Sequence, residues 1–151
     1  MDKDLDRRDV KLLRSLQEEF PLSRRPFQVI AERLGWTEQD VISGIEDLTE
    51  SGMVRKLGAV LNPRRMGYVS ILAAANIPEE NVNRTASLVN EYRGVTHNYL
   101  RDGDPNMWFT LIEPDQETLE KHLADIEEKI ETRVIRMPAT KVFKIGVKLD
   151  I

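Results

Sequence analysis

The sequence predicts an α+β chain in two parts, a winged helix-turn-helix followed by a layered sandwich of strands and helices in the order βαββαβ. Three observations carry this prediction. Amphipathic helical patterns fill residues 4–52, strand and helix patterns follow in turn from residue 68 onward, and two aromatic, β-branched runs between residues 94 and 111 form a β-hairpin pattern. We expect residues 1–61 to form the first domain, 62–67 a linker and 68–151 the second domain.

Local signals delimit three helices in the first part. In residues 4–20 the apolar side chains recur at near-helical spacing: Val10, Leu13, Leu16 and Phe20. Pro26 is placed to begin the second helix and Gly35 to end it. Thr37 and Asp40 stand at the spacing of a capping box that opens a third helix. Residues 53–61, with a glycine at their turn, are expected to form the β-wing.

The third helix has the position of a DNA-recognition helix but not its charge. Residues 37–52 contain five acidic side chains and neither Lys nor Arg. Contacts to phosphates and base edges rely on basic and amide side chains. The net charge of −4 is also unlike the basic surface of most nucleic-acid-binding proteins. We therefore expect a helix-turn-helix domain that binds no specific DNA sequence.

The second part follows the order of a ferredoxin-like fold. Residues 68–77 and 134–147 have strand patterns, and residues 79–92 and 115–131 have the apolar stripes of helices that flank the hairpin. In such a sandwich both helices cover one face of an antiparallel sheet. The other face is left for a partner, a ligand or water.

The hairpin carries the side chains that are best suited to catalysis or ligand binding. Successive side chains alternate across a strand, so His97, Tyr99 and Arg101 should share one face, while Asn98 and Leu100 share the other. At about 3.3 Å per residue, His97 and Arg101 would lie about 13 Å apart, which is the scale of a macrocycle. A half-solvated sheet surface would give the same pattern.

Composition excludes several classes of site. The chain has no Cys and two His, which excludes disulfides and thiolate metal sites and leaves too few histidines for a His-rich metal site. It has no apolar run of membrane-spanning length, and its first residues lack the apolar segment of a signal peptide. We expect a cytoplasmic protein without membrane contact that brings no metal of its own.

A resemblance extends this interpretation. The run His-Asn-Tyr-Leu-Arg at 97–101, followed by Asn-Met-Trp-Phe-Thr-Leu at 106–111, resembles the signature of the siroheme decarboxylases. These are relatives of the AsnC/Lrp regulators that act in heme and heme d1 biosynthesis. The resemblance implies an AsnC/Lrp-like fold and a carboxy-lyase that removes CO2 from two acetate side chains of siroheme to give 12,18-didecarboxysiroheme. The iron belongs to the substrate, so no cofactor is expected.

The resemblance also implies roles for individual residues. His97 would donate a proton to the new methyl group or bind the iron of the substrate. Arg101 would bind a carboxylate through its planar fork. Further residues are candidates for substrate binding: Tyr99, Asn98, Arg64, Arg65, Arg93, Asn106 and Trp108. Trp108 would otherwise be a core residue, and His122 is expected to lie at the margin of a helix without a catalytic role.

One departure from the family pattern bears on the partner. The loop after the first run usually carries a second His and a Tyr, where this chain has Gly103 and Pro105. The reduced loop suggests a heterodimer in which a homologous subunit completes the site. Two alternatives stay open, namely an AsnC/Lrp-type transcription regulator that senses a small molecule or heme, and a scaffold subunit without catalytic groups.

Overall fold

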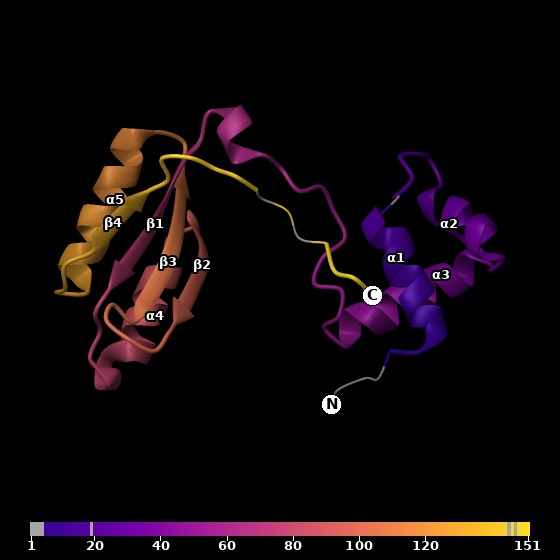
Figure 1. Cartoon of the computed structure of the whole chain (residues 1–151), viewed down its shortest axis with the longest axis horizontal. Helices are drawn as coiled ribbons and strands as arrows, with labels where there is room; N and C mark the ends of the chain where they lie inside the picture. Colours follow the sequence, from indigo (N-terminus) through magenta and orange to yellow (C-terminus); the bar gives the residue numbers. More distant parts are fainter. Residues whose placement is uncertain (1–4, 19, 145, 147) are drawn as a thin grey trace. The chain divides into compact units, whose positions relative to one another are not determined.

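The computed structural model describes residues 5–18, 20–144, 146 and 148–151 (Figure 1). The chain divides into two compact units. One comprises Met1–Ala59 together with Ile145–Ile151, and the other comprises Val60–Lys144.

Three helices form the first unit: α1 (Arg7–Glu18), α2 (Pro26–Leu34) and α3 (Glu38–Glu50). They enclose a small apolar core of Leu12, Ile30, Ala31, Val41 and Leu48. Gly35 ends α2 in the left-handed region, with φ at 70°. The capping box at the start of α3 is complete, because Thr37 and Asp40 each accept a hydrogen bond from the other's backbone. The predicted helix-turn-helix is confirmed.

The predicted β-wing is wrong, and the predicted linker at 62–67 contains a short helix. Residues 53–61 contain no strand. Of their apolar side chains only Met53 and Val54 pack on the helical core, while Val60 is fully exposed. A hairpin without a packed face is marginally stable at best, which accounts for the missing wing. The linker contains a 3₁₀ helix, Pro63–Met66, capped by the Asn62 side chain.

The end of the chain also differs from expectation. The last strand, β4, covers only Ile135–Pro138, no strand follows in residues 139–144, and positions 145 and 147 lie outside the described residues. Residues 148–151 lie along α1 instead. Gln17 and the backbone of Leu149 exchange two hydrogen bonds of 2.7 and 2.8 Å. The final segment therefore belongs to the first unit, not to the expected second domain.

The second unit is the predicted βαββαβ sandwich. Its elements before β4 are the following: β1 (Val69–Ala75), a 3₁₀ turn (Glu79–Asn81), α4 (Val82–Asn90), β2 (Val95–Leu100), β3 (Met107–Glu113) and α5 (Gln116–Lys129). All strand pairs are antiparallel, in the order β2-β3-β1-β4. Both helices cover the same face of the sheet (Figure 1).

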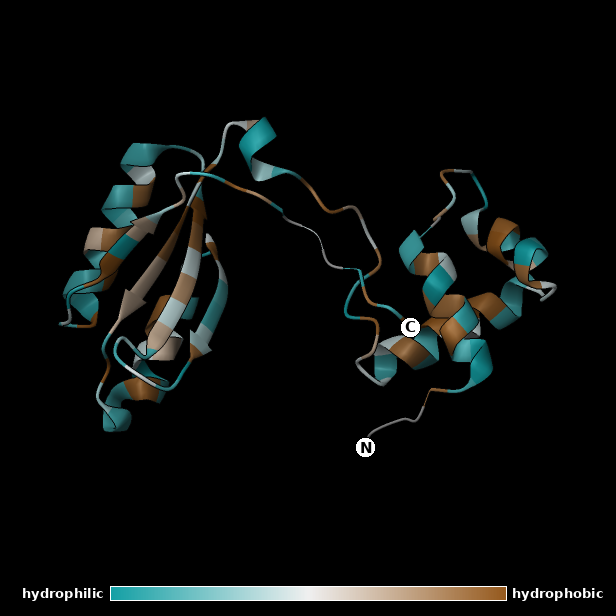
Figure 2. Ribbon diagram, viewed as in Figure 1, coloured by the Kyte–Doolittle hydropathy of each residue, from teal (hydrophilic) through white to brown (hydrophobic). Residues whose placement is uncertain are grey.

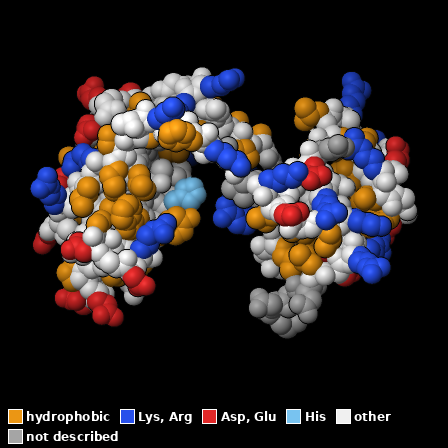
Figure 3. Space-filling view, viewed as in Figure 1, with side chains coloured by type: hydrophobic (Ala, Val, Ile, Leu, Met, Phe, Trp, Pro, Cys, Tyr) orange, Lys and Arg blue, Asp and Glu red, His pale blue; other side chains and the backbone are white. Residues whose placement is uncertain are grey.

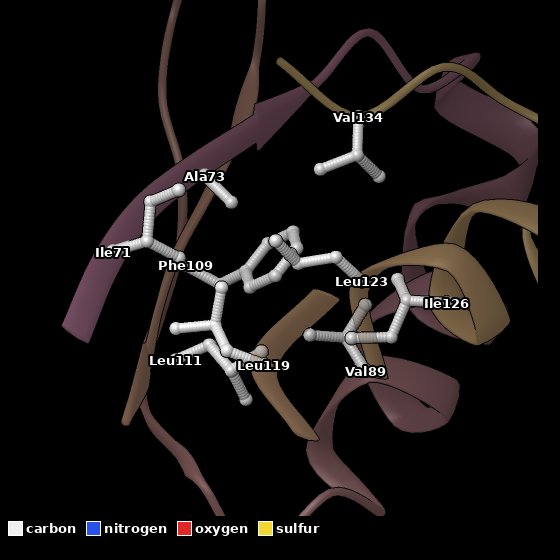
Figure 4. Packing of buried hydrophobic residues seen from close by; sticks show 9 residues of the cluster. All are labelled: Ile71, Ala73, Val89, Phe109, Leu111, Leu119, Leu123, Ile126 and Val134. Atoms are coloured by element: carbon white, nitrogen blue, oxygen red, sulfur yellow. The ribbon is translucent and has the colours of Figure 1, made fainter. Parts of the chain in front are cut away.

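The core lies between that face and the two helices. Its centre is Phe109, which Figure 4 shows among aliphatic side chains of the sheet and of both helices. The strands and the inner sides of the helices carry the apolar residues, and the outer helix surfaces are hydrophilic (Figure 2). Along β3, Met107, Phe109 and Leu111 are buried, whereas the residues between them are only partly so. The sheet therefore has one covered face and one open face.

Candidate functional site

An open cleft lies on the uncovered face of the sheet. It has a volume of about 570 Å³ and is lined by Leu72, His97, Tyr99, Arg101, Trp108 and Thr110. Its floor comes from β1, β2 and β3, so three paired strands fix the backbone beneath it. Around the cleft the open face carries exposed apolar side chains, among them Leu72 and Ile135 (Figure 3).

The strand register brings the predicted residues together. His97 lies opposite Thr110, and Tyr99 lies opposite Trp108. The prediction that His97, Tyr99 and Arg101 share one face of β2 agrees with this arrangement. Arg101 follows the strand directly, and its backbone N–H donates to the carbonyl of Asn106 at 2.8 Å, closing the hairpin.

The side chains form a row along the cleft. The rings of His97 and Tyr99 are 6.0 Å apart, and the guanidinium of Arg101 lies 5.6 Å from the centre of the Tyr99 ring. Trp108 donates its indole N–H to the carbonyl of Pro105 at 2.9 Å. Because this donor is satisfied within the protein, the indole can present an apolar surface to a ligand. An imidazole, two aromatic rings and a permanent cation thus face one space.

Two predicted substrate-binding residues lie elsewhere. Asn98 turns to the helix-covered face, because it alternates with His97 and Tyr99, and its amide donates to Asn90 at 3.0 Å. The side chain of Asn106 exchanges hydrogen bonds of 2.8 and 2.7 Å with the backbone of Ile77. Both side-chain amides form hydrogen bonds within the protein, Asn98 to another side chain and Asn106 to the backbone. This does not fit the prediction that they bind substrate.

The three predicted arginines outside the hairpin strands have different surroundings. Arg64 and Arg65 lie in the 3₁₀ helix Pro63–Met66 and do not line the cleft. Arg93 lines a second hollow of about 280 Å³, whose other walls are mostly apolar and include Tyr68 and Ile112. Arg93 directly precedes Gly94 and β2, so it lies at the opposite end of the row from Arg101. A ligand that extends along β2 would meet a cation at each end.

His122 is half-buried on α5, which agrees with the predicted position at the helix margin, and it pairs with a buried carboxylate. Its Nδ1 lies 2.7 Å from a carboxylate oxygen of Glu113, which is buried. This pair lies on the helix-covered side of the sheet. A carboxylate that is buried needs such a partner, so the pair stabilises the fold rather than forming part of the cleft.

Tyr92, Asp125 and Lys129 form a second cluster of hydrogen-bonded polar side chains on the helix-covered side. The Tyr92 hydroxyl donates to Asp125, and Lys129 donates to both at 2.9 and 3.0 Å. The Tyr92 hydrogen bond and the Lys129 ammonium lower the pKa of Asp125. Burial and the Asp125 carboxylate raise the pKa of Tyr92, and the Tyr92 and Asp125 oxygens raise the pKa of Lys129. These groups satisfy one another and line no part of the cleft.

Sequence reasoning missed three residues of the site: Leu72, Thr110 and Thr96. The hydroxyl of Thr96 lies 3.0 Å from Nδ1 of His97. A signal for Thr96 was available, since apolar Val95 and polar His97 would share a face in a regular strand. Leu72 gave none, because β1 is apolar on both faces.

Two further properties concern metals and membranes. Within the described part of the chain, no cluster of three or more His, Cys, Asp or Glu residues could hold a metal ion. None of the helices among the described residues is both long enough and apolar enough to cross a bilayer.

Known proteins match both units. Residues 9–55 match the siroheme decarboxylase NirDL-like HTH domain, and residues 65–144 match the AsnC-like ligand binding domain. The siroheme decarboxylase alpha subunit of Desulfovibrio desulfuricans is 41% identical over 95% of this chain and 83% of its own length. The chain belongs to the siroheme decarboxylase family. The resemblance drawn from the hairpin motif is thereby confirmed.

Solved structures agree with this assignment. The crystal structure of the siroheme decarboxylase NirDL in complex with an iron-uroporphyrin III analogue matches with a TM-score of 0.68 and 30% identity. The match covers 91% of this chain and 47% of that one. An AsnC family transcriptional regulator from Agrobacterium tumefaciens has a TM-score of 0.78 at 24% identity, which shows the shared fold alone.

Proposed function

We propose that this chain is a subunit of an enzyme that removes CO2 from two acetate side chains of siroheme and yields 12,18-didecarboxysiroheme. The observation that carries the proposal is the cleft itself. It combines His97, Tyr99, Arg101 and Trp108 on an open sheet face, in a chain 41% identical to a siroheme decarboxylase subunit.

The reaction needs a proton donor, a group that binds the carboxylates of the substrate and an apolar surface against the macrocycle. When an acetate group loses CO2, the electrons of the broken C–C bond pass into the macrocycle, and the new methyl carbon must then gain a proton. His97 can donate that proton and recover it from solvent, because an imidazole ring can act as a general acid and as a general base. Its Nε2 could instead bind the iron of siroheme, a role that excludes proton transfer from the same nitrogen. No cofactor is needed, since the substrate carries its own iron.

The other cleft residues suit a flat, anionic ligand. Arg101 can hold a carboxylate of the substrate in a bidentate pair, and Arg93 can hold another beyond the far end of β2. Tyr99 and Trp108 offer apolar surface between them. Arg64 and Arg65 lie in the 3₁₀ helix whose Pro63 and Met66 line the same hollow as Arg93, so they are further candidates for binding a carboxylate at that end.

A homologous subunit would complete the site. The cleft is open, so it can cover only one side of a macrocycle, and the exposed Leu72, Tyr99 and Ile135 around it favour a second protein surface. Gly103 and Pro105 in the hairpin loop leave this chain without the loop His and Tyr of the family pattern. NirDL is about twice as long as the matched region, which fits a pair of such units.

The proposal is tested by measuring the turnover of siroheme. Purified chain, alone and with its homologous subunit, is incubated with siroheme without oxygen, and the products are followed by mass spectrometry. We expect stepwise loss of two CO2 molecules when both subunits are present. Unchanged siroheme in every combination would contradict the proposal. Full turnover with a His97→Ala chain would favour the scaffold alternative instead.

We also propose that the helix-turn-helix unit binds no specific DNA sequence. Helix α3 carries acidic residues in its first turn and no basic residue in its last turn, so it would be repelled by phosphates. A selection from random or genomic DNA at physiological salt should return no consensus. One tight consensus site would overturn this proposal and favour the regulator.

A further inference from the structure

Strand β2 is irregular at Thr96. Val95 lies opposite Leu111, and His97 lies opposite the next residue of β3, Thr110. Two steps on β2 therefore match one step on β3, which is the pattern of a β-bulge, and Thr96 is the extra residue.

The bulge decides which face His97 occupies. Val95 packs against the buried core, whereas His97 lines the open cleft. Residues two apart in a regular strand share a face, so an unbroken β2 could not satisfy both positions. A shift of one residue moves every later side chain to the other face. The extra residue thus keeps Val95 in the core and turns His97, Tyr99 and Arg101 to the cleft.

The backbone that precedes the bulge, at Gly94 and Val95, is held in place by hydrogen bonds and close packing. The carbonyl of Gly94 accepts a hydrogen bond of 2.8 Å from Ile112, and the N–H of Val95 donates to Tyr92 at 2.9 Å. A Cβ on Gly94 would lie 2.3 Å from the carboxylate of Glu113 and 2.5 Å from the Ile112 carbonyl. Only glycine permits this approach, so the irregularity has a defined place.

The bulge also places the Thr96 hydroxyl beside its neighbour's ring, 3.0 Å from Nδ1 of His97. We propose that Thr96 is a positioning residue, whose hydroxyl accepts the hydrogen bond of the His97 Nδ1–H and leaves Nε2 as the nitrogen that exchanges protons in the cleft. Only the role of Nε2 in proton exchange rests on the proposed function; the hydrogen bond between Thr96 and His97 does not.

The chemistry follows from the two ring nitrogens. The imidazolium form of His97 donates through Nδ1–H to Thr96 and through Nε2–H to the ligand. When Nε2 gives up its proton, the neutral ring still carries Nδ1–H, so neither the ring nor the hydroxyl must reorient before the next proton arrives from solvent. Without this acceptor, neutral imidazole favours the Nε2–H form, in which the acceptor nitrogen is the one turned away from the cleft.

The two histidines of the chain make the test direct. His122 is an internal reference, because its Nδ1 faces a carboxylate, which accepts only, and must therefore carry a proton. The ring nitrogens of the ¹⁵N-histidine-labelled chain are recorded by NMR above the titration range, where both rings are neutral. We expect His97 to show the Nδ1–H form, like His122. Thr96→Val should shift it to mainly Nε2–H, and Thr96→Ser should retain the wild-type form.

A matched control and a rate measurement complete the experiment. Thr49 of α3 donates its hydroxyl to the carbonyl of Ile45 and does not line the cleft, so Thr49→Val should change neither reading. With the homologous subunit and siroheme, Thr96→Val should lower kcat about three- to tenfold with KM unchanged, and Thr96→Ser should restore it.

Two results would overturn the inference. One is a wild-type His97 that is mainly Nε2–H, and the other is a Thr96→Val chain whose His97 is unchanged. The NMR reading needs no substrate, so it stands or falls independently of siroheme turnover.

Discussion

Trp108 and Phe109 are neighbours in one strand, and they show how differently the two faces of the sheet are built. Phe109 is 1% exposed and packs among aliphatic side chains of α4, α5 and the sheet. Trp108 lies on the other face, lines the cleft and keeps part of its surface open. The side chains of the covered face must fill the core, whereas those of the open face contribute less to the fold of the isolated chain and, in the proposed function, serve the reaction. Substitutions on the two faces should therefore separate stability from activity.

The largest effect is expected at His97 on the open face. His97→Ala should lower siroheme decarboxylation by two to four decades, the usual range for an acid-base group. The free energy of unfolding should barely change, because the ring is exposed in the isolated chain. Product mass spectrometry with the homologous subunit present gives the first quantity, and urea unfolding gives the second. Undiminished turnover would assign the catalytic acid to the partner.

The pair at positions 108 and 109 is the sharpest test of the comparison. Phe109→Ala should lower the free energy of unfolding by about 3–5 kcal/mol, since it leaves a cavity in the core. Trp108→Ala should cost clearly less stability but should weaken siroheme binding. Urea unfolding and an absorbance titration measure the two effects. Equal losses of stability at both positions would show that the faces are not divided in this way.

Arg101 should affect binding more than the chemical step. Arg101→Ala should weaken siroheme binding by about 1.5–3 kcal/mol, the range of a charge-assisted hydrogen bond. Arg101→Lys is the matched variant, because it keeps the charge and loses the planar fork. We expect it to bind with intermediate affinity. If Arg101→Ala binds siroheme as tightly as the wild type, the carboxylate anchor must lie elsewhere.

The smallest effect is expected on the covered side, at Glu127. The N–H of Val134 and the guanidinium of Arg136 donate to Glu127 and hold the pKa of its carboxylate below the ordinary value. A lowered pKa stabilises the folded state above the unfolded pKa of about 4.3, and this stability is lost as the pH falls through the folded pKa. Glu127→Gln should thus lower the stability by about 1 kcal/mol or less at pH 7. The difference should shrink as the pH falls below the unfolded pKa and through the folded pKa, and a difference that does not change with pH would exclude this origin.

The sequence was sufficient for much of the fold and for the main row of the site. Periodicity located the helices, and strict alternation placed His97 and Tyr99 on one face, because these signals are local. The β-wing was predicted wrongly because a hairpin needs a packed face, and of the apolar side chains in residues 53–61 only Met53 and Val54 pack on the helical core. The partners of Asn98 and Asn106 were missed because their hydrogen bonds join segments distant in sequence, up to 29 residues apart. Apolar Val95 and polar His97 signalled an irregular strand, but the position of the bulge at Thr96 required the register of β3.

The two histidines also provide the most direct test of where the substrate binds. His97 lies on the open face, and His122 pairs with Glu113 on the covered side. The ¹⁵N-histidine-labelled chain, with its unlabelled homologous subunit, is titrated with the metal-free form of siroheme, whose ring current shifts the resonances of groups held against it. We predict a large shift of the His97 ring that saturates with tetrapyrrole absorbance, and a much smaller one for His122. A larger shift at His122, or saturated binding that leaves His97 unmoved, would contradict a site on the open face.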